Sequence, residues 1–184
     1  RLRFNYSFHS SSNMNIFFLS EDPILAAEMS CDRHSIKMIL ESAQMLSTCL
    51  RQHGYDGEEY IYGSTHLNHP STIWTGKNLA NFEWVLSHAL ALCREYTARY
   101  GKFHKSEDIL YRCGELREQY IPAGSLTVPP KCMGLEYKIG EANWYGVVAS
   151  YRNYYRKGKT YMNKGKGPQW NKIPSRRPDW YGRI

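Results

Sequence analysis

The 184-residue chain lacks several features that would indicate common classes of protein. No apolar run approaches the roughly 18 residues of a membrane-spanning helix. No charged start leads into an apolar segment with a small-residue cleavage site, so we expect no signal peptide. The Walker loop, the dinucleotide-binding glycine fingerprint, the GxSxG elbow and the HExxH motif are missing as well. These absences argue against nucleotide-driven, serine-hydrolase and zincin chemistry.

Cysteine is scarce, and its pattern does not suggest a disulfide framework. The cysteines are odd in number and widely spaced, at positions 31, 49, 93, 113 and 132. We therefore expect reduced, mostly buried thiols and a cytoplasmic protein, in the host cytoplasm if the chain comes from a phage. Cys31-x-x-His34 and His66-x-x-His69 each supply only two ligands, which do not make a metal site. We predict neither a metal nor a cofactor.

Positive charge is concentrated at one end of the chain. Residues 151–184 hold ten Lys and Arg against a single acid, whereas the first 150 residues have a net charge of −2. Tyr and Trp are interleaved with these cations, a composition that suits phosphate pairing and base stacking on a nucleic acid. The alternative is a basic segment that only aids solubility. An anionic membrane is less favoured, because no hydrophobic anchor is present. The cations predicted to contact DNA are Arg152, Arg156, Lys157, Lys159, Lys164, Lys166, Arg176 and Arg177.

The hydrophobic pattern predicts a mainly α, compact single domain. We expect Met14 to be the natural first residue and 1–13 to be a leader or added segment. Residues 14–157 would form the helical domain, and 158–184 an extended basic aromatic tail that packs on the domain or on DNA. A short buried strand or extended entry is expected at 16–19. Predicted helices cover about 23–29, 32–52 with Asp32 as its cap, 74 or 77 to 100, 106–119 and 141–157.

The helix expected at 32–52 carries a candidate catalytic patch. At 100° per residue, Ile36, Ile39, Leu40, Ala43, Leu46 and Leu50 share one face. His34, Lys37 and Glu41 share the opposite face, which puts a base, a cation and a carboxylate together. Met38 and Met45 lie on the same stripe, so we expect the patch to be partly covered. The alternative is an ordinary solvated polar face.

Three separated motifs resemble one family. The first is Met-x-Ile-Phe-x-Leu from Met14, followed by the helix with His34 and Glu41. The second is Asn68-His69-Pro70 ahead of a long helix ending in Gly101, and the third is Arg177-Pro-Asp-Trp-Tyr181. Together they resemble the pyrimidine-dimer DNA glycosylases of the endonuclease V type, found in tailed phages and bacteria. The chain is more closely similar to small tailed-phage proteins of unknown function.

The resemblance implies a helical DNA-binding fold with defined site residues. Glu41 matches the catalytic carboxylate, His34 the nearby histidine, and Trp180 and Tyr181 the segment that shapes the lesion site; we also expect His69 on the DNA. Family members attack the deoxyribose C1′ with the N-terminal α-amine and form a Schiff base. Here Asn15 follows Met14 and is not small, so we expect Met14 to stay and that amine to be absent.

The same chemistry can be argued from the residues. Breaking a glycosidic bond builds positive charge on the sugar, which a carboxylate such as Glu41 stabilises. His34 or Lys37 could handle the leaving base or a water, and Lys37 could form a Schiff base if burial lowers its pKa. We therefore expect a DNA glycosylase/AP lyase-like enzyme. The alternatives are a non-catalytic nucleic-acid-binding phage protein, a transferase acting on modified pyrimidines in DNA, or a phage structural protein.

Overall fold

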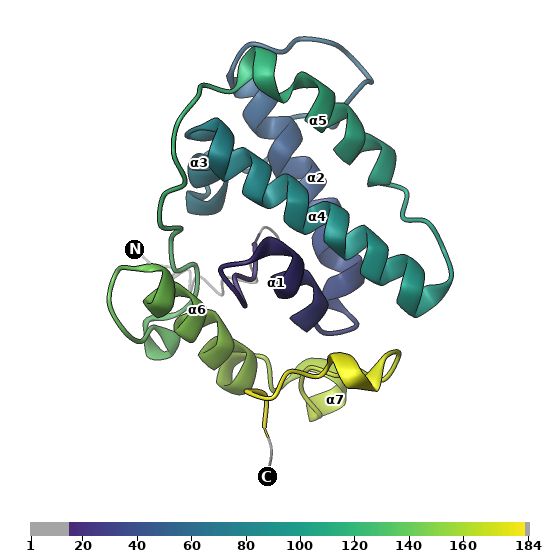
Figure 1. Cartoon of the computed structure of the whole chain (residues 1–184), viewed down its shortest axis with the longest axis vertical. Coiled ribbons are helices and arrows are strands. Elements are labelled where there is room, and N and C mark those ends of the chain that lie inside the picture. The colour runs from purple at the N-terminus through teal and green to yellow at the C-terminus, as the bar shows by residue number, and fades with distance from the viewer. Residues whose placement is uncertain (1–14, 183–184) are drawn as a thin grey trace, which may run out of the picture.

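The computed structural model of the protein describes residues 15–182 and confirms a mainly helical chain. Two long helices cross the molecule, and shorter ones surround them (Figure 1). No strand occurs in the described range. The elements are α1 (Pro23–Met29), α2 (His34–Gln52), α3 (Pro70–Gly76), α4 (Leu79–Tyr100), α5 (Glu107–Tyr120), η1 (Leu135–Tyr137), α6 (Trp144–Asn153), the π-helical turn η2 (Tyr154–Gly158), α7 (Met162–Gly165) and η3 (Pro174–Arg176).

The core lies mainly between α2 and α4, with α1, α3 and α5 packed around them. Ile39 and Leu46 of α2 and Phe82 and Leu92 of α4 are fully buried, as their helical spacing predicts. All five cysteines are free thiols; four are buried and Cys132 is half-buried. The prediction of reduced, mostly buried thiols is therefore confirmed for these positions.

The helix predicted from residue 74 or 77 to residue 100 is α4, which begins at Leu79, so the later start is nearly correct, whereas a start at residue 74 would join α4 to the separate helix α3. Asn78 has extended backbone angles (φ −159°, ψ 170°), and its side chain accepts a hydrogen bond from the Asn81 N–H at 3.0 Å. It therefore caps α4 and separates it from α3, as an asparagine at an N-cap does. At the other end, Gly101 adopts φ 67° and terminates α4 as predicted.

The N-terminal segment 15–19 is buried but is not a strand. Phe18 is fully buried, and its ring packs at 4.7 to 5.9 Å from those of Trp74, Trp84 and Trp144. The segment has no partner strand, so its backbone groups take other partners, including the Arg152 Nε that donates to Leu19 O at 2.9 Å. The burial suggested by the apolar pattern is present, whereas the strand is absent.

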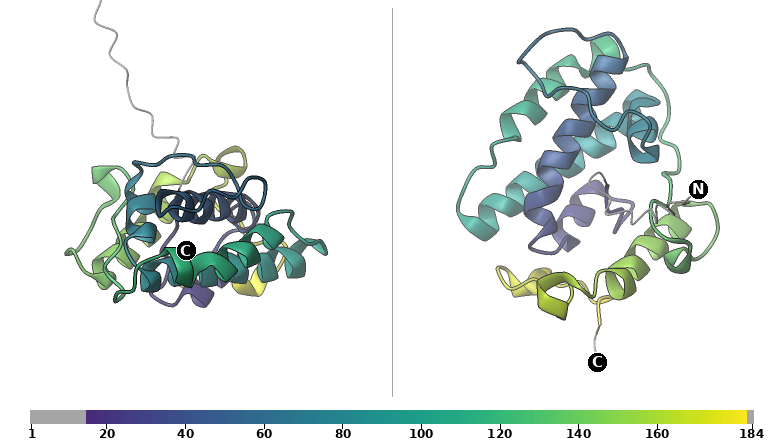
Figure 2. Two further views of the ribbon diagram at one scale, coloured as in Figure 1. Left: turned by 90° about the horizontal axis from the view of Figure 1, so that it is seen from above. Right: turned by 180° about the vertical axis from the view of Figure 1, so that it is seen from behind.

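Residues 158–182 fold onto the helices instead of extending away from them. In Figures 1 and 2 the segment lies at the end of the molecule where α1 lies. Trp170 is buried, and its Nε1 donates to Met29 O at 3.0 Å. The Asp32 carboxylate accepts from the backbone N–H groups of Asn171 and Lys172. The expected Asp32 cap of α2 is therefore wrong, because this side chain fixes the C-terminal segment instead.

Arg99 of α4 is the buried connection between α4 and the turn from α1 to α2. Its side chain has no solvent exposure. The guanidinium donates to the carbonyls of Ser30 (2.7 Å) and Glu28 (3.1 Å) and pairs with Glu95 (3.0 Å) and Asp32 (3.3 Å). If this side chain were removed, Asp32 would lose its ion-pair partner and Glu95 would keep only the less buried Arg176.

Replacing Arg99 tests this connection. We expect Arg99→Met to lower the free energy of unfolding by about 3–5 kcal/mol, because buried carboxylates and carbonyls lose their donor. The control is Arg94→Met, an exposed position on the same helix, which should change it by about 0.5 kcal/mol or less. Urea unfolding followed by circular dichroism measures both. Equal losses in the two variants would contradict the assignment.

Candidate active site on helix α2

Glu41 is a buried carboxyl covered by the N-terminal segment. Its residue exposure is 4%, and Oε2 accepts a hydrogen bond from the Asn15 backbone N–H at 3.3 Å. Lys37 Nζ lies 3.8 Å from Oε1 on the same helix. Desolvation raises the pKa of Glu41 to about 7, although the Asn15 N–H, Lys37 and Lys159 oppose the shift. Near neutral pH, this carboxyl therefore exchanges a proton readily.

His34 is a buried, neutral imidazole. Its ring stacks on Phe17 at 4.2 Å, and its Nδ1 lies 2.6 Å from the Tyr155 hydroxyl. Burial lowers the pKa of His34 well below its usual value, and the cations Lys159, Lys37 and Arg33 add to this effect. Burial raises the pKa of Tyr155, so the phenol keeps its proton. That proton can go to Nδ1 or to Cys31 Sγ at 3.7 Å, and we assign it to the much shorter contact with Nδ1, which makes Nδ1 the acceptor and leaves Nε2–H as a donor.

A cavity of about 300 Å³ opens beside these residues. His34 and Lys37 line it from α2, and Phe17 lines it from the N-terminal segment. Lys159, which follows η2, is 7% exposed and lines the same cavity. Glu41 is not among the lining residues and reaches this region through Lys37. The remaining lining residues are Arg33, Met38, Tyr161 and Met162.

The expected grouping of His34, Lys37 and Glu41 is present, but the helix faces were misjudged. Ile36 and Leu40, expected in the core, are 37% and 41% exposed. His34, Glu41, Met38 and Met45 are instead buried, the two methionines as predicted. The difference arises because segment 15–19 and the C-terminal segment cover the polar side of α2, leaving part of its apolar side to solvent.

The expected DNA-binding cations divide into two groups. Several serve the fold. Arg152 and Arg156 donate to the carbonyls of Leu19 and Trp180, and Arg176 pairs with Glu28 and Glu95. Lys159 is buried in the cavity. Lys157, Lys164, Lys166 and Arg177 are exposed. The aromatic side chains divide similarly, since Tyr151, Tyr155 and Trp170 are core residues, whereas Trp180 and Tyr181 are half-buried.

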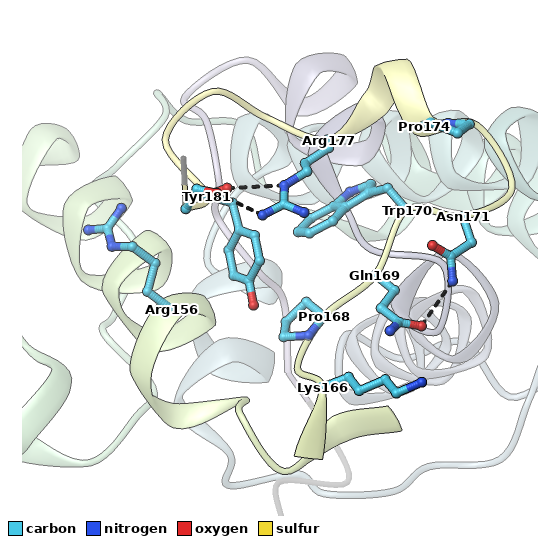
Figure 3. Close-up of a pocket in the computed structure, with 10 residues that line it drawn as sticks. Arg156, Lys166, Pro168, Gln169, Trp170, Asn171, Pro174, Arg177 and Tyr181 are labelled. Atoms are coloured by element: carbon cyan, nitrogen blue, oxygen red, sulfur yellow. Dashed lines mark hydrogen bonds between the residues drawn. The ribbon is translucent and has the colours of Figure 1, made fainter. Parts of the chain in front are cut away.

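A polar groove in the C-terminal segment retains the expected mixture of rings and cations. In Figure 3 the Tyr181 ring lies between Arg156 and the Trp170 ring, and Lys166 lies below both rings. The centroids of the two rings are 4.8 Å apart. Arg177 is turned toward the chain and donates to the carbonyls of Tyr181 and Gly182. The groove therefore offers one half-buried ring, that of Tyr181, together with the half-buried Arg156 and the exposed Lys166, whereas Trp170 is buried.

His69 has a local structural role. Its Nδ1 accepts from the Ser71 N–H at 3.1 Å and caps α3. Ser71 Oγ contacts Cys132 Sγ at 3.3 Å, and Cys132 O accepts from the Asn15 side chain at 3.0 Å. The loop thus adjoins the residue that covers Glu41, but no contact joins His69 to Glu41, Lys37 or His34 in residues 15–182.

Sequence reasoning missed three contributors to this site. Asn15 supplies the N–H that contacts Glu41, Arg33 adds a cavity cation, and Tyr155 orients His34. Arg33 precedes His34 directly and could have been found from helical position. Asn15 and Tyr155 lie far from α2 in the sequence, and no local sequence pattern indicates that they contact it.

The comparisons with known proteins give no match of any kind. Neither a family model, nor a curated protein, nor a solved structure matches the chain. Within residues 15–182, no cluster of three His, Cys, Asp or Glu side chains could hold a metal ion. No helix of that range has the length and apolar character needed to cross a membrane.

The raised pKa of Glu41 predicts that the free energy of unfolding depends on pH. Burial favours the protonated carboxyl, so its contribution to stability is complete below the ordinary value of 4.5 and is lost as pH rises to about 7. The free energy of unfolding should therefore fall over this window relative to Glu41→Gln, which has no carboxyl to ionise. Urea unfolding at several pH values measures this difference. Exposed Glu136→Gln is the control, and parallel pH profiles for wild type and Glu41→Gln would refute the assignment.

Proposed function

We propose that this protein binds DNA and acts on a base or its glycosidic bond, in the manner of a DNA glycosylase/AP lyase, with Glu41 as the central carboxylate. The observation that carries the proposal is a buried carboxyl with a pKa of about 7 beside a cationic cavity. Perturbed ionisable groups gathered at a cavity are typical of functional sites. The resemblance drawn from the sequence names the same glutamate independently of this geometry.

Glu41 suits both halves of glycosidic bond cleavage. In its ionised form it would stabilise the positive charge that develops at C1′ as the base leaves. In its protonated form it would give a proton to the departing base. His34 would act as a neutral hydrogen-bond donor, since its pKa is too low for it to serve as a cation near neutral pH.

The amine that forms a Schiff base in this proposal is Lys37. The nitrogen nearest Glu41 is that of Asn15, which follows Met14 in the sequence and therefore belongs to a peptide bond. Amide resonance removes the lone pair needed for attack. Lys37 Nζ is 3.8 Å from Glu41, and its side chain is 53% exposed at the cavity. After Lys37 gives a proton to the Glu41 carboxylate, its amine would bond to C1′ while the base leaves with the glycosidic electron pair and takes that proton from Glu41. Loss of a further proton from the amine to Glu41, and opening of the C1′–O4′ bond with that proton going to O4′, would then give the Schiff base.

A second candidate is a non-catalytic DNA-binding protein, and one observation favours it. Glu41 does not line the cavity, and Asn15 and Lys37 already occupy its two oxygens. Such an arrangement could serve the fold alone. A transferase acting on modified pyrimidines would use the same site and would differ in requiring a donor molecule.

The decisive experiment is borohydride trapping on end-labelled DNA. The substrates are plain duplex, ultraviolet-damaged, abasic and 5-hydroxymethyluracil DNA. We expect a covalent adduct or strand cleavage with wild type, and a loss of about 100-fold or more in rate with Glu41→Gln at nearly unchanged DNA affinity. Glu136→Gln is the control with full activity. If the protein binds every one of these substrates but leaves the DNA unmodified, the result would favour a non-catalytic DNA-binding protein instead.

The exposed cations of residues 151–182 provide a separate prediction. We expect Lys157→Ala/Lys164→Ala/Lys166→Ala to weaken duplex binding and to reduce the slope of log K against log salt by about 0.9 for each phosphate that the variant no longer neutralises. Truncation after Gly158 would be a poor test, because it removes the core residues Met162 and Trp170. Fluorescence anisotropy at several salt concentrations measures the slope.

The matched control for this triple variant removes three exposed cations elsewhere. Lys77→Ala/Lys102→Ala/Lys105→Ala has the same change in net charge, with positions on the α3–α4 junction and the α4–α5 loop. It should leave the salt slope within error of wild type. Equal slopes in both triple variants would show that total charge, and not the C-terminal surface, governs DNA affinity.

A further inference from the structure

Cations line the cavity beside α2, whereas Glu41, the acid paired with Lys37, is not among its lining residues. Its described lining contains Arg33, Lys37 and Lys159, whereas no Asp or Glu is among the lining residues. Burial lowers the pKa of His34, and Lys159, Lys37 and Arg33 lower it further, so all three cations act on the ring that lines this cavity. A volume of about 300 Å³ is at the small end of the range for ligand sites, which suits one nucleotide better than a duplex.

Lys159 is the most unusual of these cations. It is only 7% exposed, yet within residues 15–182 its ammonium donates one hydrogen bond, to the Tyr161 hydroxyl at 3.3 Å. The rings of Phe17, Tyr154 and Tyr161 surround it, with centroids 4.7 to 5.6 Å from Nζ. No carboxylate of the described chain lies within salt-bridge distance of it. Cation–π contacts stabilise an ammonium, and with one hydrogen bond made this group has donors left for an anion.

The other lining groups complement an anion that carries a flat ring. His34 contributes a neutral Nε2–H donor, following the tautomer assigned above. Arg33 provides a planar fork of donors that matches phosphate oxygens. Tyr161 is 65% exposed and lies next to Lys159, where its ring is accessible for stacking.

We propose that this cavity is a phosphate-binding site for a single nucleotide, with Lys159 as its buried anchor and Arg33 and Lys37 at its entrance. The inference rests on the proposed function in placing a nucleotide there, and it adds that the group bound beside Glu41 is a phosphate. Lys159 lies too deep to reach the backbone of an undistorted duplex on the surface. The phosphate therefore belongs to an extruded nucleotide within a strand or to a terminal or free nucleotide.

Calorimetric titration with thymidine 5′-monophosphate and with thymidine tests the site. We expect wild-type protein to bind the phosphorylated probe at least 10-fold more tightly than the nucleoside. Lys159→Met should abolish that preference, while Lys159→Arg, which retains the charge, should keep most of it. Equal affinity for the two probes, or a preference that survives in Lys159→Met, would overturn the proposal.

A second variant guards against misfolding of Lys159→Met. Arg33→Gln/Lys37→Gln changes two exposed positions at the cavity entrance and should lower affinity for the phosphorylated probe about 10-fold or more. The control Lys102→Gln/Lys105→Gln changes the net charge equally at exposed positions of the α4–α5 loop that do not line this cavity, and should bind the phosphorylated probe as wild type does. Equal losses in both variants would show that net charge, and not this cavity, holds the phosphate.

Separate experiments identify the kind of phosphate that binds and test the catalytic proposal. Octathymidylate with and without a 5′-phosphate distinguishes a terminal monoester from a phosphodiester, because only the former requires the added phosphate. Glu41→Gln should bind thymidine 5′-monophosphate at least as well as wild type, since it removes a nearby negative charge. Phosphate binding without any DNA chemistry would support this site and defeat the glycosylase proposal. Chemistry without a phosphate preference would do the reverse.

Discussion

The burial of residues 15–19 between the helices and the C-terminal segment is the constraint on which the structure depends. A backbone without a partner strand must find other hydrogen bonds when it is removed from water. Here Asn15 N–H finds the Glu41 carboxylate, and Leu19 O finds the Arg152 guanidinium. These two contacts tie the segment to α2 on one side and to α6 on the other. The same burial desolvates Glu41 and raises its pKa, so the fold and the unusual carboxyl have one cause.

Burying the ionisable groups of this site costs folding free energy. Glu41, His34 and Lys159 are all buried, and each is only partly compensated by its neighbours. A purely structural core usually pairs such groups fully or replaces them with apolar side chains of similar size. A buried ammonium held mainly by aromatic rings, beside a neutral imidazole, is instead the arrangement expected when a ligand completes the charge balance. For this reason we favour a functional role for these residues over a structural one.

The sequence predicted the local features well and the long-range ones poorly. Helices α1, α2 and α5 follow from apolar spacing and end signals, and the spacing of His34, Lys37 and Glu41 identified one patch on α2. The assignment of Ile36 and Leu40 to the core was wrong, because periodicity cannot tell which side of a helix another segment will cover. Lys159 was expected to contact DNA as one of many cations in residues 151–184, because composition alone does not distinguish among them. Its burial depends on packing against Phe17 and Tyr154, which no short-range pattern reveals.

The folding of the C-terminal segment changes what its positive charge can do. Arg176 bonds Glu28 and Glu95, Arg152 and Arg156 hold backbone carbonyls, and Lys159 enters the cavity. A guanidinium engaged in this way still contributes to the long-range field, but it cannot pair with a phosphate without giving up an internal contact. If the protein binds DNA as proposed, non-specific attraction would therefore depend on fewer exposed cations than the composition suggests. Selectivity would then lie in the enclosed site, where a buried cation distinguishes ligands by what they place against it and not by their total charge.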